Sequence, residues 1–276
     1  MPPANVDDDF SAGLDPRWLV TRPGGGLVEV VDSNLRLELP GAVVGAYSDA
    51  QIDDYSGQSR PTFPWRPPLK LAVRARFSHL VHPIATADIG ANQRLLNGTA
   101  GVGFWNYPLS LTGAVLRLPD AIWFFGASQP SNMALVPGVP GWGWKAQVVH
   151  AHRLGAIAAA GPTALSALWS RLSGREEAAA RWVQRLTGAR EARLMNDARE
   201  WATYEIEWLP ERATFRLDGA TVLVATNPPA GPLGFVAWVD NQYAVATPRG
   251  VLRFGTIASE REWLELEYIR IHPLGA

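Results

Sequence analysis

The sequence predicts an all-β protein of antiparallel strands, and three observations carry that prediction. Residues 201–219 alternate between apolar and polar side chains on both sides of a Pro-Glu turn and end in Asp218-Gly219, which is a β-hairpin signal. Residues 69–79 alternate in the same way along one longer strand. Residues 99–108 and 118–132 are instead apolar almost throughout, which is typical of strands covered on both faces.

The overall composition limits the possible classes of protein. The 276 residues are enough for one large sandwich, so we expect a single domain over residues 1–276. The formal net charge of -1 provides no field that would attract nucleic acid or an anionic membrane. The absence of cysteine excludes disulfides and thiolate catalysis.

Nothing in the sequence predicts membrane insertion or export. No apolar run reaches the roughly 18 residues that a membrane-spanning helix needs. The first ten residues, MPPANVDDDF, have neither the basic start nor the apolar segment of a signal peptide. We therefore expect a cytoplasmic protein, or an exported one whose leader is missing from this sequence.

Two interior stretches depart from the strand pattern. Residues 49–68 are polar and then proline-rich, which predicts an extended loop. Residues 153–200 are rich in Ala, Leu, Arg and Glu, and their apolar residues recur at helical spacing, which predicts amphipathic helices. This helical insertion would cover a sheet, act as a lid or contact a protein partner, and the sequence leaves the three roles open.

Three segments resemble the family-sixteen glycoside hydrolases, the laminarinases and lichenases. The segment WATYEIEWLPERATFRLDGATVL, from residue 201, resembles their late hairpin. WLELEYIRIH at 263–272 resembles their last strand, and DDFS at 8–11 resembles their opening strand. The resemblance frames the chain from residue 8 to residue 272. It implies a concanavalin A-like jelly-roll β-sandwich of two antiparallel sheets, here with the helical insertion at about 153–200.

The catalytic motif of that family is absent. The resemblance implies a strand with carboxylates on one face, two of them about 5 Å apart as nucleophile and general acid. The matching stretch here reads AIWFFGAS, with Trp123 and Phe125 at the positions where carboxylates are needed. Asp120 is the only acidic residue between Asp88 and Glu176. One carboxylate cannot perform that double displacement, so the family's hydrolysis is not expected in its usual form.

A polar cluster in a late strand is the main candidate for ligand contact. Asp240, Asn241 and Tyr243 interrupt an apolar run, and burying such groups is costly unless they find partners or a ligand. The resemblance implies that late strands contribute to the concave sheet where sugars lie. The full set of candidate ligand-binding residues is Trp105, Asn106, Trp123, Trp144, Asp240, Asn241 and Tyr243. The alternative is a hairpin turn at residues 240–241.

Three functions remain open at this stage. The first is a non-hydrolytic binding protein that holds a glycan or a partly hydrophobic ligand in an aromatic cleft. The second is a glycoside hydrolase or lyase with relocated acid and base residues, for which Asp240 with Asp120 or Glu205 are the candidates. The third is an assembly subunit that meets a protein partner through the helices at 153–200.

Calcium is the one metal that the resemblance implies. In the family, an acidic residue of the last strand holds the ion together with backbone carbonyls of the opening segment, and hard oxygen ligands suit calcium. Glu267 matches that acidic position, with Glu in place of the usual Asp, and Asp9 lies in the opening segment. These two residues are the candidate calcium ligands, and no other cofactor is predicted.

Overall fold

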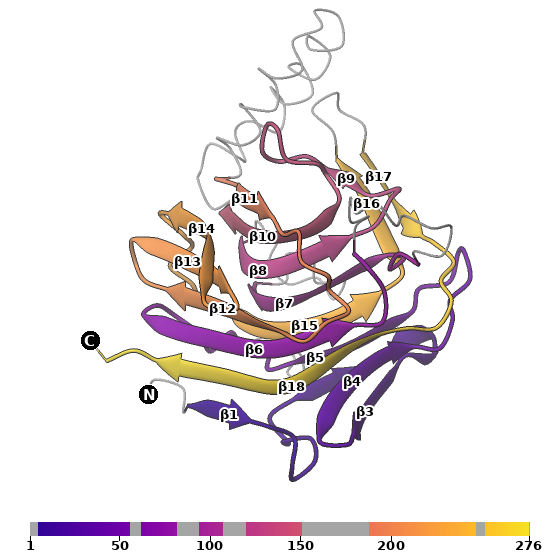
Figure 1. Cartoon of the computed structure of the whole chain (residues 1–276), viewed down its shortest axis with the longest axis horizontal. Helices are drawn as coiled ribbons and strands as arrows, with labels where there is room; N and C mark the ends of the chain where they lie inside the picture. Colours follow the sequence, from indigo (N-terminus) through magenta and orange to yellow (C-terminus); the bar gives the residue numbers. More distant parts are fainter. Residues whose placement is uncertain are drawn as a thin grey trace, which may run out of the picture.

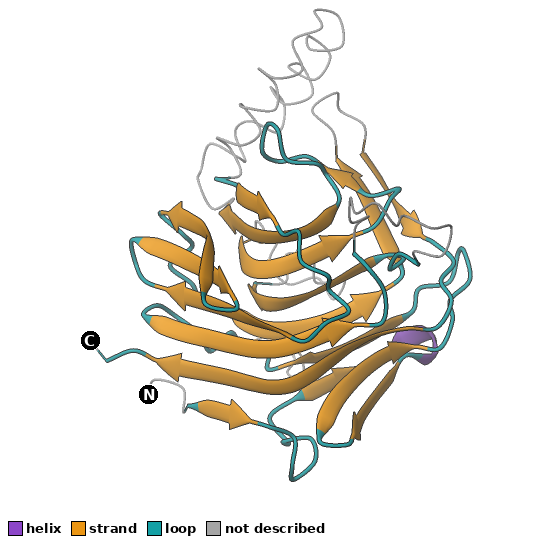
Figure 2. Ribbon diagram, in the orientation of Figure 1, coloured by secondary structure: helices purple, strands orange, loops and turns teal. Residues whose placement is uncertain are grey.

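The structure is a computed structural model that describes residues 5–55, 62–81, 94–106, 120–150, 188–246 and 252–275. Two large antiparallel sheets lie face to face as the layers of a sandwich (Figure 1). The predicted all-β architecture is confirmed, and Figure 2 shows strands throughout the described chain. Within those ranges the one helical element is the short 3-10 turn η1 at Pro23–Gly25, so no described helix is long enough to cross a membrane.

The first sheet has eight strands among the described residues, in the order β14-β13-β12-β6-β18-β4-β3, with β1 also pairing with β18. Its strands are β1 Val6–Asp8, β3 Leu27–Val31, β4 Asn34–Leu39, β6 Leu69–Phe77, β12 Ala202–Trp208, β13 Arg212–Leu217, β14 Ala220–Thr226 and β18 Glu262–Pro273. The first and last described strands therefore lie side by side (Figure 1).

The second sheet has seven described strands, in the order β11-β10-β8-β7-β15-β5-β2. Its strands are β2 Leu19–Thr21, β5 Asp49–Asp53, β7 Thr99–Trp105, β8 Asp120–Ala127, β10 Gly143–His150, β11 Arg190–Arg193 and β15 Gly234–Asp240. A small sheet of β9 Asn132–Met133, β16 Gln242–Ala246 and β17 Leu252–Thr256 lies at one end of the sandwich.

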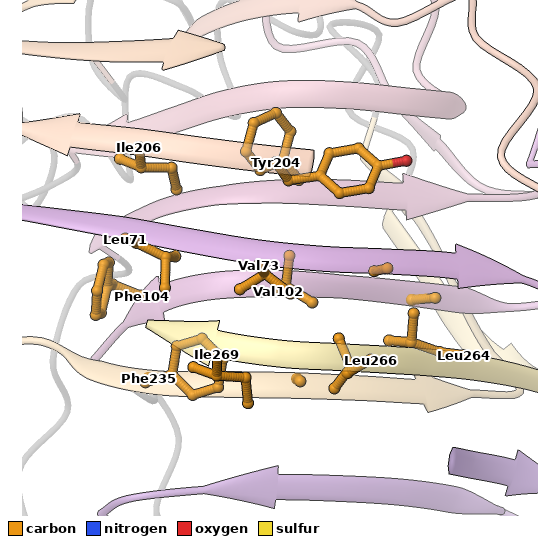
Figure 3. Packing of buried hydrophobic residues seen from close by; sticks show 14 of the residues in the cluster. Leu71, Val73, Val102, Phe104, Tyr204, Ile206, Phe235, Leu264, Leu266 and Ile269 are labelled. Carbon is orange, nitrogen blue, oxygen red and sulfur yellow. The ribbon is translucent and has the colours of Figure 1, made fainter. Parts of the chain in front are cut away.

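The core lies between the two large sheets, as period-two alternation dictates. In β6 the residues at odd positions from Leu69 to Phe77 are buried, and those between them are half-exposed. Figure 3 shows Leu71 of β6 and Ile269 of β18 on one side of the core, with Phe104 and Phe235 of the second sheet on the other. The long alternating strand predicted at 69–79 is thus confirmed.

The predicted hairpin at 201–219 is also confirmed, as β12 paired with β13. Asp218 and Gly219 join β13 to β14 and have φ values of 48° and 79°. Positive φ at both central residues is what a tight two-residue turn between twisted strands requires.

Two sequence predictions need correction. Residues 190–193, placed in the helical insertion, form strand β11, which pairs with β10 through Glu191 and Gln147. Residues 188–189 and 194–200, also placed in the insertion, form no helix either. Residues 153–187 lie outside the described residues, so the proposed roles of that segment stay predictions. Residues 49–53, placed in a loop, form strand β5, because Ala50 and Ile52 alternate with polar residues and are fully buried in the core.

Candidate functional site

The outer face of the seven-stranded sheet carries the candidate site. In β8, Ile122 and Phe124 point into the core between the sheets. Successive side chains of a strand point to opposite faces, so Trp123 and Phe125 point outward. They belong to a second apolar cluster, separate from the core. β8 therefore presents aromatic rings on the outer face of the seven-stranded sheet.

Four rings form what we call the aromatic platform: Trp105, Trp123, Phe125 and Trp238. Trp123 lies at its centre, with its ring centroid 5.7 Å from that of Trp105, 5.3 Å from Phe125 and 5.2 Å from Trp238. The Trp123 and Phe125 rings are stacked, with an interplanar angle of 20°. Trp105 and Trp123 are half-buried, so part of the platform is open to solvent.

Glycines in β7 make room for these rings. Gly101 lies in register between Phe125 and Trp238, and Gly103 lies opposite Trp123. A Cβ atom added at Gly101 would lie 2.6 Å from the Trp238 ring, and one at Gly103 would lie 2.6 Å from the Trp123 Cβ. Both distances are shorter than van der Waals contact. The platform therefore packs closely against bare backbone, which any larger residue in β7 would disturb.

A polar chain fixes one side of the platform. Trp123 Nε1 donates to Gln147 Oε1 at 2.5 Å, and Gln147 Nε2 donates to Glu191 Oε1 at 2.5 Å. Lys145 Nζ lies 3.4 Å from Glu191 Oε2, and both side chains are buried. Burial raises the pKa of Glu191 and lowers the pKa of Lys145, while the attraction between the two charges partly offsets each shift. This series of side-chain hydrogen bonds orients the Trp123 ring.

The other side of the platform is tied to the segment after β5. Trp105 Nε1 donates a hydrogen bond to the Tyr55 hydroxyl, and the Tyr55 ring lies 5.2 Å from that of Phe63. Both rings belong to the platform's apolar cluster. Asp54 anchors this segment by accepting hydrogen bonds from Trp65 Nε1 at 2.5 Å and from Phe235 N at 2.9 Å. Burial raises the pKa of Asp54 to about 7.

Asp240 is paired with a second carboxyl group that the sequence pattern did not suggest. It lies directly opposite Asp49 in the β15–β5 register, on the same outer face as Trp238. Burial raises the pKa of Asp240 to about 6, and burial together with the Asp240 charge raises the pKa of Asp49 well above its usual range. Asp240 Oδ1 accepts from the Thr99 hydroxyl at 2.8 Å and from Gln242 N at 3.1 Å. Asp49 is only 2% exposed and Asp240 only 6%, so the pair is buried away from solvent.

The structure does not bring Asp240 near the other proposed acid and base residues. Asp120 begins β8, while Asp240 is in register with Thr99 and Ala127 at the opposite end of that strand. At roughly 3.3 Å per residue, the two are about 23 Å apart along the sheet. Asp120 Oδ1 lies 2.9 Å from His150 Nδ1. Glu205 is on the eight-stranded sheet, where it forms an ion pair with Lys70 at 2.5 Å.

Three further candidate ligand residues lie away from the platform's surface. Trp144 faces the core, fully buried between Phe77 and Tyr204, so it cannot contact a ligand on the outer face. Asn106 is 3% exposed and its Oδ1 accepts from Asp120 N. Asn241 is fully buried and its amide bonds the backbone of Ser48, Ala46 and Ile257.

Tyr243 is half-buried in β16, which pairs with β17 and β9. The alternative of a hairpin turn at residues 240–241 is not what forms, because β16 does not pair back on β15. Instead the chain leaves the large sheet at Asn241 and enters the small one. Tyr243 therefore belongs to the rim at the end of the sandwich.

The two candidate calcium ligands each have a protein partner. Glu267 forms an ion pair with Arg74, and Asp9 Oδ1 accepts from the Ser11 hydroxyl at 2.7 Å. Among the residues the structure describes, no three acidic, histidine or cysteine side chains converge as a metal site would require. Since carbonyl oxygens also bind calcium, the ion stays a prediction.

Sequence reasoning missed Phe125 and Trp238 as platform members, as well as Glu191 and Asp49. The signal for the first two was present. Phe125 lies two residues after Trp123 in β8, and Trp238 lies two residues before Asp240 in β15. Side chains two residues apart in a strand point to the same face of the sheet. No local signal marks Glu191 or Asp49, because their partners are far away in the sequence.

Comparison with known proteins identifies the fold. The sequence matches no family model and no curated protein. A β-glucanase from Bacillus licheniformis superposes with a TM-score of 0.52 at 10% identity, over 99% of this chain and 100% of that one. A structure from work on endo-acting O-glycanases of the human gut microbiota, which initiate mucin breakdown, gives 0.52 at 12% identity, over 98% and 99%. A β-1,3-glucanase from Mycobacterium marinum gives 0.50 at 14% identity, over 96% and 97%.

These superpositions cover almost the whole of both chains, so the similarity includes both sheets. The resemblance to the family-sixteen hydrolases and related concanavalin A-like proteins is therefore confirmed at the level of the fold. The identities of 10–14% show the fold and no more.

Proposed function

We propose that this protein binds a glycan, or a partly hydrophobic glycan conjugate, on the aromatic platform without hydrolysing it. The observation that carries this proposal is the identity of the outward-facing residues of β8, which are Ala121, Trp123, Phe125 and Ala127. None of them can donate a proton or act as a nucleophile. Two of them are rings in contact with further rings, and aromatic faces supply large apolar contact area to a ligand.

The neighbouring structures support a glycan as the ligand. They include a β-glucanase, a β-1,3-glucanase and O-glycanases, all of which act on glycans and share this sandwich. A chain of glycosidase ancestry that exchanged its acids for aromatic rings would keep the ability to bind while losing the ability to cleave. Trp123 and Phe125 occupy the two positions at which the resemblance predicts those acids.

The test is a binding titration against a panel of soluble β-glucans and mucin-type O-glycans, read by calorimetry. Trp123→Ala should weaken binding about tenfold to thirtyfold, the usual loss on truncating a central aromatic anchor. Trp201→Ala is the matched control. Trp201 is also half-buried, but its ring contacts Arg76 on the opposite sheet. Equal affinity of the Trp123→Ala variant and the unaltered protein for every ligand that binds would contradict the proposal.

A hydrolase or lyase is the second candidate, because Asp49 and Asp240 are adjacent carboxyl groups with pKa values raised by burial. Two carboxyl groups at suitable separation are the machinery of glycoside hydrolysis. Against it stands their burial, which leaves no access for a sugar. Release of reducing ends from any glycan of the panel, abolished by Asp240→Asn with the fold intact, would favour this candidate over simple binding.

A further inference from the structure

A shallow hollow lies beyond the end of β8, and its lining has two different parts. The more open part, about 400 Å³, is lined by Gln129, Pro130, Ser131, Asn132 and Trp142. The more enclosed part, about 130 Å³, shares Gln129 and Trp142 and adds Val81, Leu95, Asn97 and Ser128. Amide and hydroxyl groups thus dominate one part, while the side chains of Val81 and Leu95 bring apolar surface to the other.

The hollow continues the line of the aromatic platform. Trp123, Phe125 and Ala127 face outward in β8, and Gln129 lies in the turn that follows the end of that strand. Trp142 immediately precedes β10, whose first residue, Gly143, pairs with Ala127. A ligand with several sugar residues could therefore contact both places.

The groups around the hollow are held in place from behind. The Arg193 guanidinium lies over the Trp142 ring at 5.6 Å from its centroid. Ser128 Oγ accepts from Gly98 N at 2.8 Å, and the buried Ser131 Oγ accepts from Ala244 N at 3.3 Å. Gln129 and Asn132 have exposed side chains that can turn toward a ligand.

We propose that this hollow is a subsite for one N-acetylhexosamine residue of the glycan, an inference that rests on the proposed function. The sugar hydroxyls and the acetamido group would bond the exposed side chains of Gln129 and Asn132, while the ring lies against Trp142. The acetyl methyl would enter the enclosed part beside Val81 and Leu95. A plain hexose lacks that methyl group and would leave the apolar surface of Val81 and Leu95 exposed to water, which is unfavourable.

The subsite can be probed without the platform by saturation-transfer NMR on the methyl glycosides of N-acetylglucosamine and glucose. The acetyl methyl should receive the strongest saturation. The acetylated sugar should bind about fourfold more tightly than glucose, which is the value of burying one methyl group. Leu95→Asn should remove that preference, whereas the volume-conserving control Leu95→Met should keep it. Trp142→Ala should weaken both sugars.

Saturation that is even over the sugar ring, or a preference that survives Leu95→Asn, would overturn the subsite. So would the absence of any saturation transfer. The proposed function is judged separately by the response of polymer binding to Trp123→Ala. A protein that binds glycans through Trp123 but shows no acetyl preference therefore refutes the subsite alone. An acetyl preference in a protein whose polymer binding ignores Trp123 refutes the platform alone.

Discussion

The outer faces of the two sheets both arise from strand alternation, but they carry different kinds of side chain. On the eight-stranded sheet the outward side chains are charged and joined across strands. Glu265 of β18 accepts from Arg36 of β4 at 2.9 Å and from Arg76 of β6 at 2.8 Å. On the seven-stranded sheet the central outward positions of β8 and β15 carry the rings of Trp123, Phe125 and Trp238.

Tryptophan occurs on both faces, and its neighbours separate a structural from a binding role. On the outer face of the eight-stranded sheet, which we call the charged face, the Arg76 guanidinium lies 4.8 Å from the Trp201 ring centroid and 5.5 Å from that of Trp263. These rings have cations over their faces, a contact that stabilises the sheet. The Trp123 ring has other rings around it, and a charge network reaches only its Nε1 through Gln147. Within the described part of the chain, no cation lies over the Trp123 ring, and that side chain is only half-buried, so the comparison favours the seven-stranded sheet as the binding face.

The largest expected effect is a loss of stability, and it distinguishes the inner face of the seven-stranded sheet from its outer face. Trp144→Ala removes a fully buried ring that packs on Phe124 and Tyr204, so the free energy of unfolding should fall by about 3–5 kcal/mol. Trp123→Ala, from the outer face, should lose less, because that ring is half-buried. Chemical denaturation of both variants measures the difference. Equal losses would mean that the platform is a second core and not a binding surface.

The next effect concerns the charged face. Glu265→Gln replaces a buried carboxylate that accepts from two guanidinium groups, and hydrogen bonds to charged groups contribute about 1.5–3 kcal/mol each. We expect a loss near the lower end of that range, since Gln keeps one acceptor and the arginines remain partly solvated. Glycan affinity should stay unchanged. A loss of binding in this variant, with the fold intact, would move the binding face to the eight-stranded sheet.

A smaller effect is the pH dependence that the buried acids create. The pKa values of Asp54, Asp240 and Glu262 are raised by burial to about 7, 6 and 8. A carboxyl group with a raised pKa stabilises the fold while it is protonated, and that contribution is lost as the pH rises through its folded pKa. The free energy of unfolding should therefore fall between about pH 4 and pH 8. Denaturant midpoints at several pH values measure it.

Asp49→Asn sharpens this prediction at one place. The substitution removes the charge that faces Asp240, and one oxygen of Asp49 has no hydrogen-bond partner to lose. The variant should be more stable than the unaltered protein at pH 8, and its loss of stability with rising pH should be shallower. An unchanged slope would mean that the pKa of Asp49 is not raised in the folded protein.

The parts of the fold that sequence predicts are those that local alternation specifies. The hairpin of β12 and β13 and the long strand β6 each alternate over many residues, and their turns carry the residues that tight turns need. Strand β5 was missed because two of its five residues are aspartates, which are typical of loops. Its burial depends on Ala50 and Ile52 meeting the core, a tertiary contact that no local pattern shows.

The candidate site was predicted in part, for the same reason. Trp105, Trp123 and Asp240 do lie on one face, as the resemblance to the hydrolases implied. Trp144 was predicted to contact a ligand, but it faces the core. Gly143 in fact begins β10, and the buried Val148 of that strand fixes the parity that turns Trp144 inward. The sequence did not predict that Asp49 pairs with Asp240. The pairing register of two strands that are far apart in the chain cannot be predicted from either strand alone.

The smallest expected effect tests the plainest ion pair of the charged face. Lys70 Nζ lies 2.5 Å from Glu205 Oε1 across β6 and β12, and the lysine is well exposed. Exposed pairs contribute about 0.2–1 kcal/mol, so Glu205→Gln should lower the free energy of unfolding by no more than that. Because Glu205 lies on the sheet opposite the platform, glycan binding and any glycan turnover should be unaffected. A variant that folds normally but loses turnover would instead return Glu205 to the candidates for general acid or base, and would place the active face on the charged sheet.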